Sequence, residues 1–264
     1  MTQPDPDQAA KAEAIEFAHR LLGRWQEVLG AELVGAYLIG SLAHEGFSRR
    51  YSDVDLGLVT TAGLSEAMLA RLRDEAAALS AAWGPKVSIF WTDRRFSLGR
   101  FPPLDRIDYL DHAVKLIERE RVRPPRPALE EIRHYLREAP FAGWVGRAQS
   151  FASAATLAPQ DRKAYLRTHL YPARLCYSWR TGRMGSNDEA VAHLRQNPVD
   201  ALDIALVERA LQCRRDAADP DTLFPARVAL PAQVDACAAM LHSGARAKSA
   251  RAALKRRKSA ATRA

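Results

Sequence analysis

The segment from Ala36 to Val59 constrains this chain most, because it joins a sharp turn to a closely spaced acidic pair. The apolar run Tyr37–Ile39 ends at Gly40 and Ser41, which is the pattern of a buried strand that meets a tight turn. Ser41 stands where a helix would begin. Its hydroxyl and the nearby backbone N–H groups are therefore placed to hold an anion.

The acidic pair, Asp53 and Asp55, opens a second apolar run, Leu56–Val59. Residues i and i+2 of a strand point to the same face, so the two carboxylates are expected side by side. Neighbouring carboxylates repel each other unless a cation lies between them, and oxygen ligands of this kind suit Mg²⁺. The pattern predicts phosphoryl or nucleotidyl transfer. The alternative is an ordinary turn followed by solvated charges at a strand edge.

Gly40–Ser41, a spacer and then Asp53-x-Asp55 in an apolar strand resemble the signature of the DNA polymerase beta-like nucleotidyltransferase superfamily. A second segment, residues 175–188, resembles the C-terminal region of the aminoglycoside (streptomycin/spectinomycin) adenylyltransferases. In that group a helix rich in Leu, Cys and Tyr runs into a Thr-Gly-[Lys/Arg] turn, and a further helix then opens with Lys-Asp. The two resemblances together cover about residues 15–215.

The resemblance implies that Gly40 and Ser41 contact the phosphates of a nucleoside triphosphate, and that Asp53 and Asp55 bind Mg²⁺ and carry catalysis. The metal would orient the triphosphate and neutralise charge while an acceptor hydroxyl attacks the α-phosphoryl group and pyrophosphate leaves. The expected activity is transfer of a nucleoside monophosphate, AMP from ATP, to a hydroxyl of a small-molecule acceptor.

Two positions depart from the family pattern. Lys86 stands where the family has a third carboxylate, which binds metal or accepts the hydroxyl proton. A protonated lysine cannot bind Mg²⁺, but its charge could contact the nucleotide or replace one metal ion. Asn187 stands where the resembling enzymes have a phosphate-contacting lysine, and Arg183 is expected to supply that charge. Arg49 contacts phosphates or is a solvated loop residue. Substitutes for the missing carboxylate are sought among Asp93, Asp105, Asp108, Asp111 and Glu45.

These departures leave two functions open. One is an active Mg²⁺-dependent nucleotidyltransferase, and the other is a catalytically degenerate nucleotide-binding or regulatory protein of the same fold. The acceptor also stays open between an antibiotic, a small metabolite and a protein hydroxyl. A polycationic aminoglycoside would need an acidic lining, for which the sequence offers Glu130, Glu131, Asp188 and Glu189.

The pattern of elements predicts an α+β fold, in which a small mixed β-sheet nucleotidyltransferase domain with flanking helices precedes a C-terminal α-helical bundle. The first domain is expected over residues 1–122, followed by the proline-rich linker Arg123–Pro127 and a helical substrate- and nucleotide-binding domain over residues 127–242. The expected strands are 33–39, 53–59, 86–92 and 114–117, and the helices include 8–29, 64–83, 128–138, 141–157, 161–181, 186–195, 200–217 and 231–258. Pro172 is expected to kink or split the helix that contains it.

Composition excludes several classes of protein. No apolar run approaches the ~20 residues of a membrane-spanning helix, and no basic-then-apolar leader is visible at the N-terminus. Three well-separated cysteines do not form a disulfide framework, so we expect a cytoplasmic protein. The net charge of +8 belongs to residues 243–264, a basic tail expected to be partly disordered. It has no aromatic residues, so a solvated tail is favoured over contact with nucleic acid.

Overall fold

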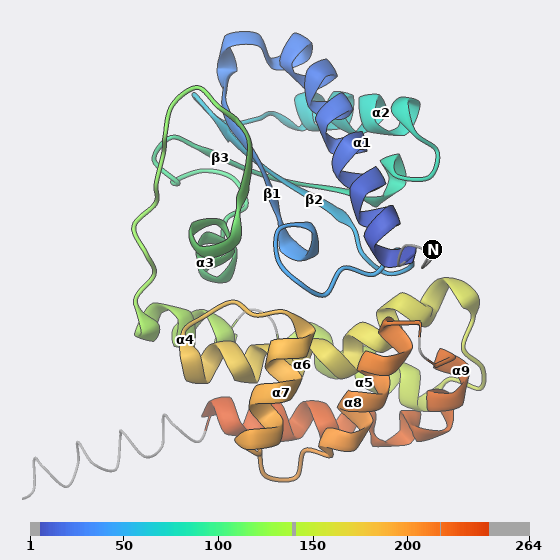
Figure 1. Ribbon diagram of the computed structural model, residues 1–264. Coiled ribbons are helices and arrows are strands. Elements are labelled where there is room, and N and C mark those ends of the chain that lie inside the picture. Colours follow the sequence, from blue (N-terminus) through green and yellow to red (C-terminus); the bar gives the residue numbers. More distant parts are fainter. Residues whose placement is uncertain (1–5, 139–140, 217, 243–264) are drawn as a thin grey trace, which may run out of the picture. The chain divides into compact units, whose positions relative to one another are not determined.

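The computed structural model describes residues 6–138, 141–216 and 218–242 (Figure 1). It divides into two compact units, Met1–Ala128 and Leu129–Ala264. The first combines a four-stranded sheet with helices, and the described part of the second contains helices without strands. The predicted α+β class is therefore confirmed. The basic tail, residues 243–264, lies outside the described residues, and the predictions made for it stay predictions.

The strands lie in the order β3-β2-β1-β4, and the sheet is mixed. β1 is antiparallel to β2 and β4, whereas β2 and β3 are parallel. The register pairs Ile39 with Asp55 and Val54 with Val87. The end of β1, the start of β2 and the start of β3 therefore meet at one end of the sheet. The strands are β1 (Leu33–Ile39), β2 (Val54–Thr60), β3 (Val87–Asp93) and β4 (Val114–Glu118).

Helices cover both faces of this sheet (Figure 1). α1 (Pro6–Leu29) and α2 (Glu66–Leu79) pack on one face, where the indole of Trp25 donates a hydrogen bond of 3.0 Å to the carbonyl oxygen of Leu72. α3 (Pro103–His112) lies on the other face and contributes Tyr109 to a smaller core cluster. Coverage of both faces explains why all seven residues of β1 are buried.

Three predicted boundaries, at the end of α2 and at the starts of β2 and β3, shift by a residue or more. α2 ends at Leu79 rather than at residue 83, because Gly84 packs against that helix and a Cβ atom there would lie 2.3 Å from the Ala76 carbonyl oxygen. The 3₁₀ turn Gly84–Lys86 follows, so Lys86 directly precedes β3 instead of opening it. Asp53 likewise lies one residue before β2.

The second unit is arranged around its longest helix, α6 (Arg162–Thr181), which contacts α4, α5, α7 and α8. Pro172 lies inside α6 without dividing it, and Gly182 ends the helix in the left-handed conformation at φ 68°. The other helices are α4 (Leu129–Glu138), α5 (Phe141–Ser153), α7 (Asn187–Gln196), α8 (Ile204–Arg214), α9 (Pro220–Leu223) and a helical stretch over residues 230–242.

Within the described residues, no helix combines the length and the apolar character needed to cross a membrane. The expected cytoplasmic location stays a prediction.

Candidate functional site

Gly40 is the residue at which the turn and the acidic pair meet. Its φ of 65° favours glycine, and a Cβ atom at this position would lie 2.4 Å from the Oδ2 atom of Asp55. The pairing of Ile39 with Asp55 between β1 and β2 produces this approach. Only a residue without a side chain lets the Asp55 carboxylate lie so close to the turn.

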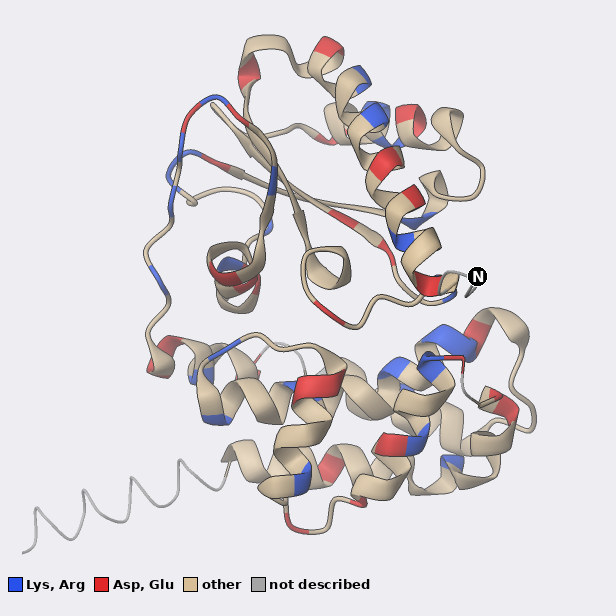
Figure 2. Ribbon diagram, in the orientation of Figure 1, with Lys and Arg blue, Asp and Glu red and all other residues tan. Residues whose placement is uncertain are grey.

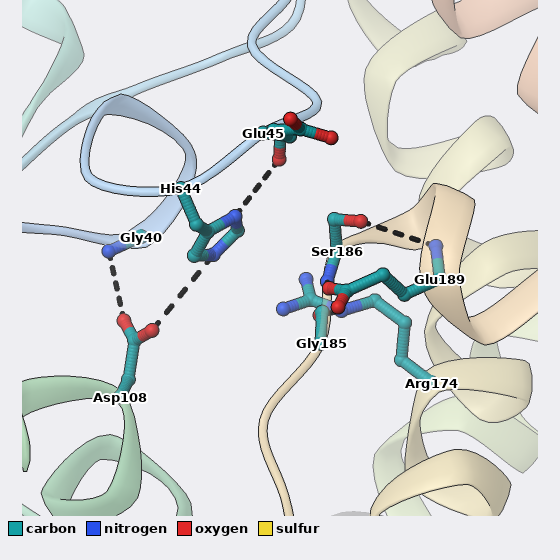
Figure 3. A network of polar contacts seen from close by, with 8 residues as sticks. All are labelled: Gly40, His44, Glu45, Asp108, Arg174, Gly185, Ser186 and Glu189. Atoms are coloured by element: carbon teal, nitrogen blue, oxygen red, sulfur yellow. Dashed lines mark hydrogen bonds and ion pairs between the residues drawn. The ribbon is translucent and has the colours of Figure 1, made fainter. Parts of the chain in front are cut away.

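The backbone of Gly40 is held from the other side by Asp108, a buried carboxylate on α3 (Figure 3). The Gly40 N–H donates to Asp108 Oδ2 at 2.8 Å, while the Gly40 carbonyl accepts from the N–H groups of Ala43 and His44. The Gly40 amide is therefore already engaged. Among the described residues, the hydroxyl of Ser41 has no hydrogen-bond partner, so it is the group of this turn best placed to contact a ligand.

His44 lies against the second oxygen of Asp108 (Figure 3). Its Nε2 atom is 3.8 Å from Asp108 Oδ1, and its Nδ1 atom is 2.8 Å from the carbonyl oxygen of Glu45. The ring of His112 meets that of His44 edge to face at 5.4 Å. A protonated His44 would place a positive charge beside the buried carboxylate.

The sequence suggested Asp108 only as a replacement for the missing carboxylate and missed its bond to Gly40. The signal was its position beside Ile107 on the apolar face of a helix, since a buried carboxylate requires a partner. The partner itself lies 68 positions away in the chain. Only the packing of α3 on the sheet brings the two together.

Asp55 lies on β2 and Asp53 directly precedes that strand, and both are partly buried. The described residues contain no group of three or more His, Cys, Asp or Glu that could hold a metal ion. Two carboxylates nevertheless fit the needs of Mg²⁺, which keeps several water ligands and takes further oxygens from substrate phosphates.

Three of the five carboxylates considered as replacements for the third ligand form contacts elsewhere. Asp93 accepts hydrogen bonds from the N–H and hydroxyl of Ser97 and from the N–H of Leu98. Burial alone would raise the pKa of Asp93, but these hydrogen bonds outweigh it and lower the pKa below its ordinary value. Asp111 pairs with Arg126, and Asp108 holds the turn.

Lys86, which the resemblance in the sequence aligns with the third carboxylate, contacts the loop that precedes the acidic pair. Its Nζ atom donates to the carbonyl oxygen of Arg49 at 2.9 Å and lies 4.8 Å from the ring centroid of Trp83. The parallel register of β2 and β3 begins with Val54 and Val87, so Asp53 and Lys86 are the two residues that directly precede the first pair. A positive charge thus stands where the resemblance implies a negative one. The side chain of Arg49 itself is exposed.

The second unit holds the other two predicted residues, Arg183 and Asn187. Asn187 is the first residue of α7, which begins with the predicted capping box: Ser186 accepts from the Glu189 N–H at 3.1 Å, and Glu189 accepts from the Ser186 N–H at 2.8 Å (Figure 3). Arg174 of α6 donates through Nε to the carbonyl oxygen of Gly185 at 3.0 Å. These contacts fix the backbone that leads into α7. The other six predicted residues, Gly40, Ser41, Arg49, Asp53, Asp55 and Lys86, belong to the first unit.

Neither the protein-family models nor the curated proteins include a match to this chain. Among solved structures, the chain is similar to the spectinomycin adenyltransferase AAD(9) from Enterococcus faecialis, whose crystal structure contains ATP and spectinomycin. The two are 11% identical over 85% of this chain and 99% of the other, with a TM-score of 0.58. At this identity the likeness establishes the fold, and it agrees with the resemblance seen in the sequence. The chain therefore has a nucleotidyltransferase-like fold.

Proposed function

We propose that this protein is a Mg²⁺-dependent nucleotidyltransferase that moves AMP from ATP to a hydroxyl of a small-molecule acceptor and releases pyrophosphate. The observation that carries the proposal is the close approach of the Asp55 carboxylate to Gly40, on a fold shared with an adenyltransferase. A phosphate-binding turn next to an acidic pair is the arrangement that this chemistry requires.

The candidate site residues described above have the following roles in this proposal. The Ser41 hydroxyl contacts the triphosphate, and the absence of a side chain at Gly40 lets the Asp55 carboxylate lie against the turn. Asp108 fixes the turn through the Gly40 N–H. Asp53 and Asp55 would hold Mg²⁺, which when bound neutralises charge that develops on the phosphoryl group. Arg183 and Asn187 are proposed to contact the nucleotide from the second unit.

The positive charge of Lys86 supports phosphate binding but offers no base for the attacking hydroxyl while the amine is protonated. General-base catalysis typically contributes 10²–10⁴-fold to a rate, so we expect turnover slower by roughly that factor than with a carboxylate at this position. The proton of the acceptor hydroxyl then passes to solvent water as the new P–O bond forms.

The same lysine favours a second candidate, a nucleotide-binding protein with little or no turnover. Its hydrogen bond to the Arg49 carbonyl fixes a cation beside Asp53, where a second metal ion or a base would act. Such a protein would bind Mg²⁺ and ATP through the same turn and acidic pair without completing the transfer.

The metal-dependent site is tested by ATP titration in Mg²⁺ and in EDTA, which requires no acceptor. We expect ATP to bind at least tenfold more tightly with Mg²⁺, and Asp53→Asn or Asp55→Asn to remove that difference while circular dichroism stays unchanged. Asp111→Asn, which removes an exposed, ion-paired carboxylate from α3, serves as the control and should retain it. Equal affinity in Mg²⁺ and EDTA would contradict the metal site.

Lys86→Glu separates the two candidates. Pyrophosphate release is measured with Mg²⁺–ATP and a panel of hydroxyl-bearing acceptors for the natural protein and the variant. Activity in the natural protein that rises in the variant supports the proposed enzyme, whereas activity that the variant loses would assign Lys86 a working role of its own. Activity that appears only in the variant supports the degenerate protein.

A further inference from the structure

A cluster of three arginines surrounds two stacked aromatic rings in the second unit; we call it the arginine cluster (Arg147, Arg167 and Arg174 around Trp144 and Tyr171). The Trp144 ring of α5 stacks on the Tyr171 ring of α6, with centroids 5.0 Å apart at 27°. The guanidinium of Arg147 lies 5.2 Å from the Trp144 centroid, and those of Arg167 and Arg174 lie 5.1 and 5.2 Å from the Tyr171 centroid. The spacing i, i+4, i+7 places Arg167, Tyr171 and Arg174 on one face of α6.

No carboxylate of the described residues pairs with any of these three arginines. The one hydrogen bond that they form within the described chain runs from Arg174 Nε to the carbonyl of Gly185, which leaves the terminal nitrogens of Arg174 available. Several other arginines of the unit are neutralised by acids. Figure 2 shows both signs along these helices, and the ion pairs are Arg133–Glu130, Arg162–Asp219, Arg162–Asp221, Arg195–Glu208 and Arg215–Asp188.

Three of the four acids named for the lining of a cationic acceptor's site are engaged in ion pairs or in a helix cap. Glu130 pairs with Arg133, Asp188 pairs with Arg215, and Glu189 completes the capping box of α7. The surface around the stacked rings therefore carries positive charge without a compensating carboxylate from the described residues. Such a surface repels a polycation and attracts an anion.

The chemistry of the guanidinium makes the cluster suitable for oxyanions. A guanidinium held over an aromatic ring is weakly hydrated and keeps its N–H donors in its own plane. Those donors match two oxygens of a phosphate or carboxylate at once. Two aromatic rings that hold three such groups in place reduce the ordering cost when an anion binds.

We propose that the arginine cluster binds the acceptor, and that this acceptor is an anion with phosphate or carboxylate groups rather than a polycationic aminoglycoside. The role as acceptor site rests on the function proposed above, whereas the binding of an oxyanion does not depend on it.

The position of the cluster favours the acceptor over the nucleotide. Arg183 and Asn187, the nucleotide contacts proposed for this unit, lie beyond the C-terminal end of α6. Arg167 precedes Thr181 by 14 residues, which is about 21 Å along a helix that rises 1.5 Å per residue. Arg174 lies between these two regions, so the variants below leave it unchanged.

Oxyanion binding is tested on the full chain by NMR, with inorganic phosphate as the probe. Mg²⁺ and a non-hydrolysable ATP analogue are kept saturating, and sodium chloride holds the ionic strength constant. We expect phosphate to shift the indole N–H signal of Trp144, assigned with Trp144→Phe, in a saturable manner. The double variant Arg147→Gln/Arg167→Gln should weaken phosphate binding at least tenfold.

The control removes two positive charges from the same unit at ion-paired positions. Arg195→Gln/Arg215→Gln should leave phosphate affinity within twofold. Arg147→Lys/Arg167→Lys, which keeps charge and side-chain length, should lower phosphate affinity less than Arg147→Gln/Arg167→Gln does. No shift of the Trp144 signal, or an equal loss in the cluster and control variants, would overturn the site. An equal loss of affinity for the ATP analogue would assign the cluster to the nucleotide and overturn the acceptor role.

Turnover distinguishes a failure of this inference from a failure of the proposed function. Pyrophosphate release is followed with hydroxyl-bearing anions, such as glucose 6-phosphate and gluconate, and with spectinomycin. We expect an anionic acceptor to support turnover, with its KM raised at least tenfold in Arg147→Gln/Arg167→Gln and the KM for ATP unchanged. Turnover of spectinomycin alone, unaffected by that variant, would overturn the acceptor class while the transferase stands. Phosphate binding with no turnover of any acceptor would leave the anion site in place and remove the transferase.

Discussion

Gly40 lies between two carboxylates, with Asp55 against its Cα and Asp108 on its N–H. The backbone conformation and the space around it impose the same requirement. A positive φ disfavours any residue with a side chain, and the Asp55 carboxylate occupies the volume that a side chain would need. Gly40 is therefore the residue of the turn whose substitution is least tolerated.

Gly40→Ala is expected to lower the free energy of unfolding by about 1–3 kcal/mol, because strain at a left-handed position adds to displacement of Asp55. The affinity for Mg²⁺–ATP should fall with it, since Asp55 moves. Urea denaturation and ATP titration measure the two effects.

Gly23→Ala provides the matched control for that variant. Gly23 lies on α1, and a Cβ atom there would meet nothing within 4 Å beyond the backbone of its own helix, so alanine should stabilise the protein by about 0.5–1 kcal/mol. If Gly40→Ala unfolded at the same urea concentration as the natural protein, the described turn geometry would be wrong.

At this scale, the sequence was most informative where contacts are local. The spacing of Gly40–Ser41 and Asp53–Asp55 anticipated a turn next to an acidic pair, and the Ser186–Glu189 capping box was evident from four consecutive residues. Asp108 could not be assigned, since its bond to Gly40 depends on the packing of a whole helix. Lys86 was placed on a strand because the close packing of Gly84 on α2 leaves no trace in the sequence pattern.

Among the elements, α6 carries an unusual buried group. Both ring nitrogens of His169 are buried and have no hydrogen-bond partner in the described part of the chain. Burial lowers the pKa of His169 to about 4, and the positive charge of Arg209 acts in the same direction. The folded protein therefore keeps this imidazole neutral at pH values where the unfolded chain protonates it.

The stability of the second unit should consequently fall as the pH decreases from about 6.5 towards 4. In this range the unfolded chain binds a proton that the folded chain does not, so protonation favours unfolding, by up to roughly 3 kcal/mol at the lower limit. His169→Leu should flatten the dependence of unfolding free energy on pH, as measured by urea denaturation between pH 4 and pH 7.

His134→Gln is the control for this effect, because His134 is exposed on α4 and pairs with Glu138. His134→Gln should leave the dependence of the unfolding free energy on pH unchanged. Asp93, whose pKa is lowered, loses its stabilising contribution only as the pH falls through values below those of an ordinary aspartate. If His169→Leu kept the full dependence of the unfolding free energy on pH, a group other than His169 would be responsible for it.

The elements themselves followed the sequence pattern closely. β1 agrees with its prediction at both ends because its apolar run is bounded by turn residues. Pro172, by contrast, does not split α6, which continues through it, and the predicted kink stays a prediction. The packing of α6 against four neighbouring helices offsets the ~3 kcal/mol that a proline costs in the interior of a helix.

For the whole molecule, the two core clusters of the first unit draw only on residues that precede Ala128. Trp25, Leu21 and Leu56 are fully buried within the larger cluster. A unit with its own core is able to fold alone. The intact chain is then expected to depart from a two-state transition.

A fragment of residues 1–128 should therefore unfold cooperatively in urea, as followed by the fluorescence of its three tryptophans, Trp25, Trp83 and Trp91. Its stability should lack the pH dependence assigned to His169, which belongs to the other unit. A gradual, non-cooperative transition of the fragment would show that the first unit requires the second.

The alternation of strand and helix patterns predicted the fold class. The acceptor chemistry could not be predicted from the sequence, because the arginine cluster is assembled from two separate helices, α5 and α6.

The two carboxylates around Gly40 have a consequence for how magnesium and the nucleotide affect each other's binding. Asp55 and Asp108 surround the turn with negative charge, which opposes a free triphosphate and favours one whose charge a cation has reduced. In the proposed enzyme, magnesium and nucleotide then act as mutual heterotropic effectors, and each raises the affinity for the other by the same factor. The turn selects the metal complex of the nucleotide from a pool in which both forms are present.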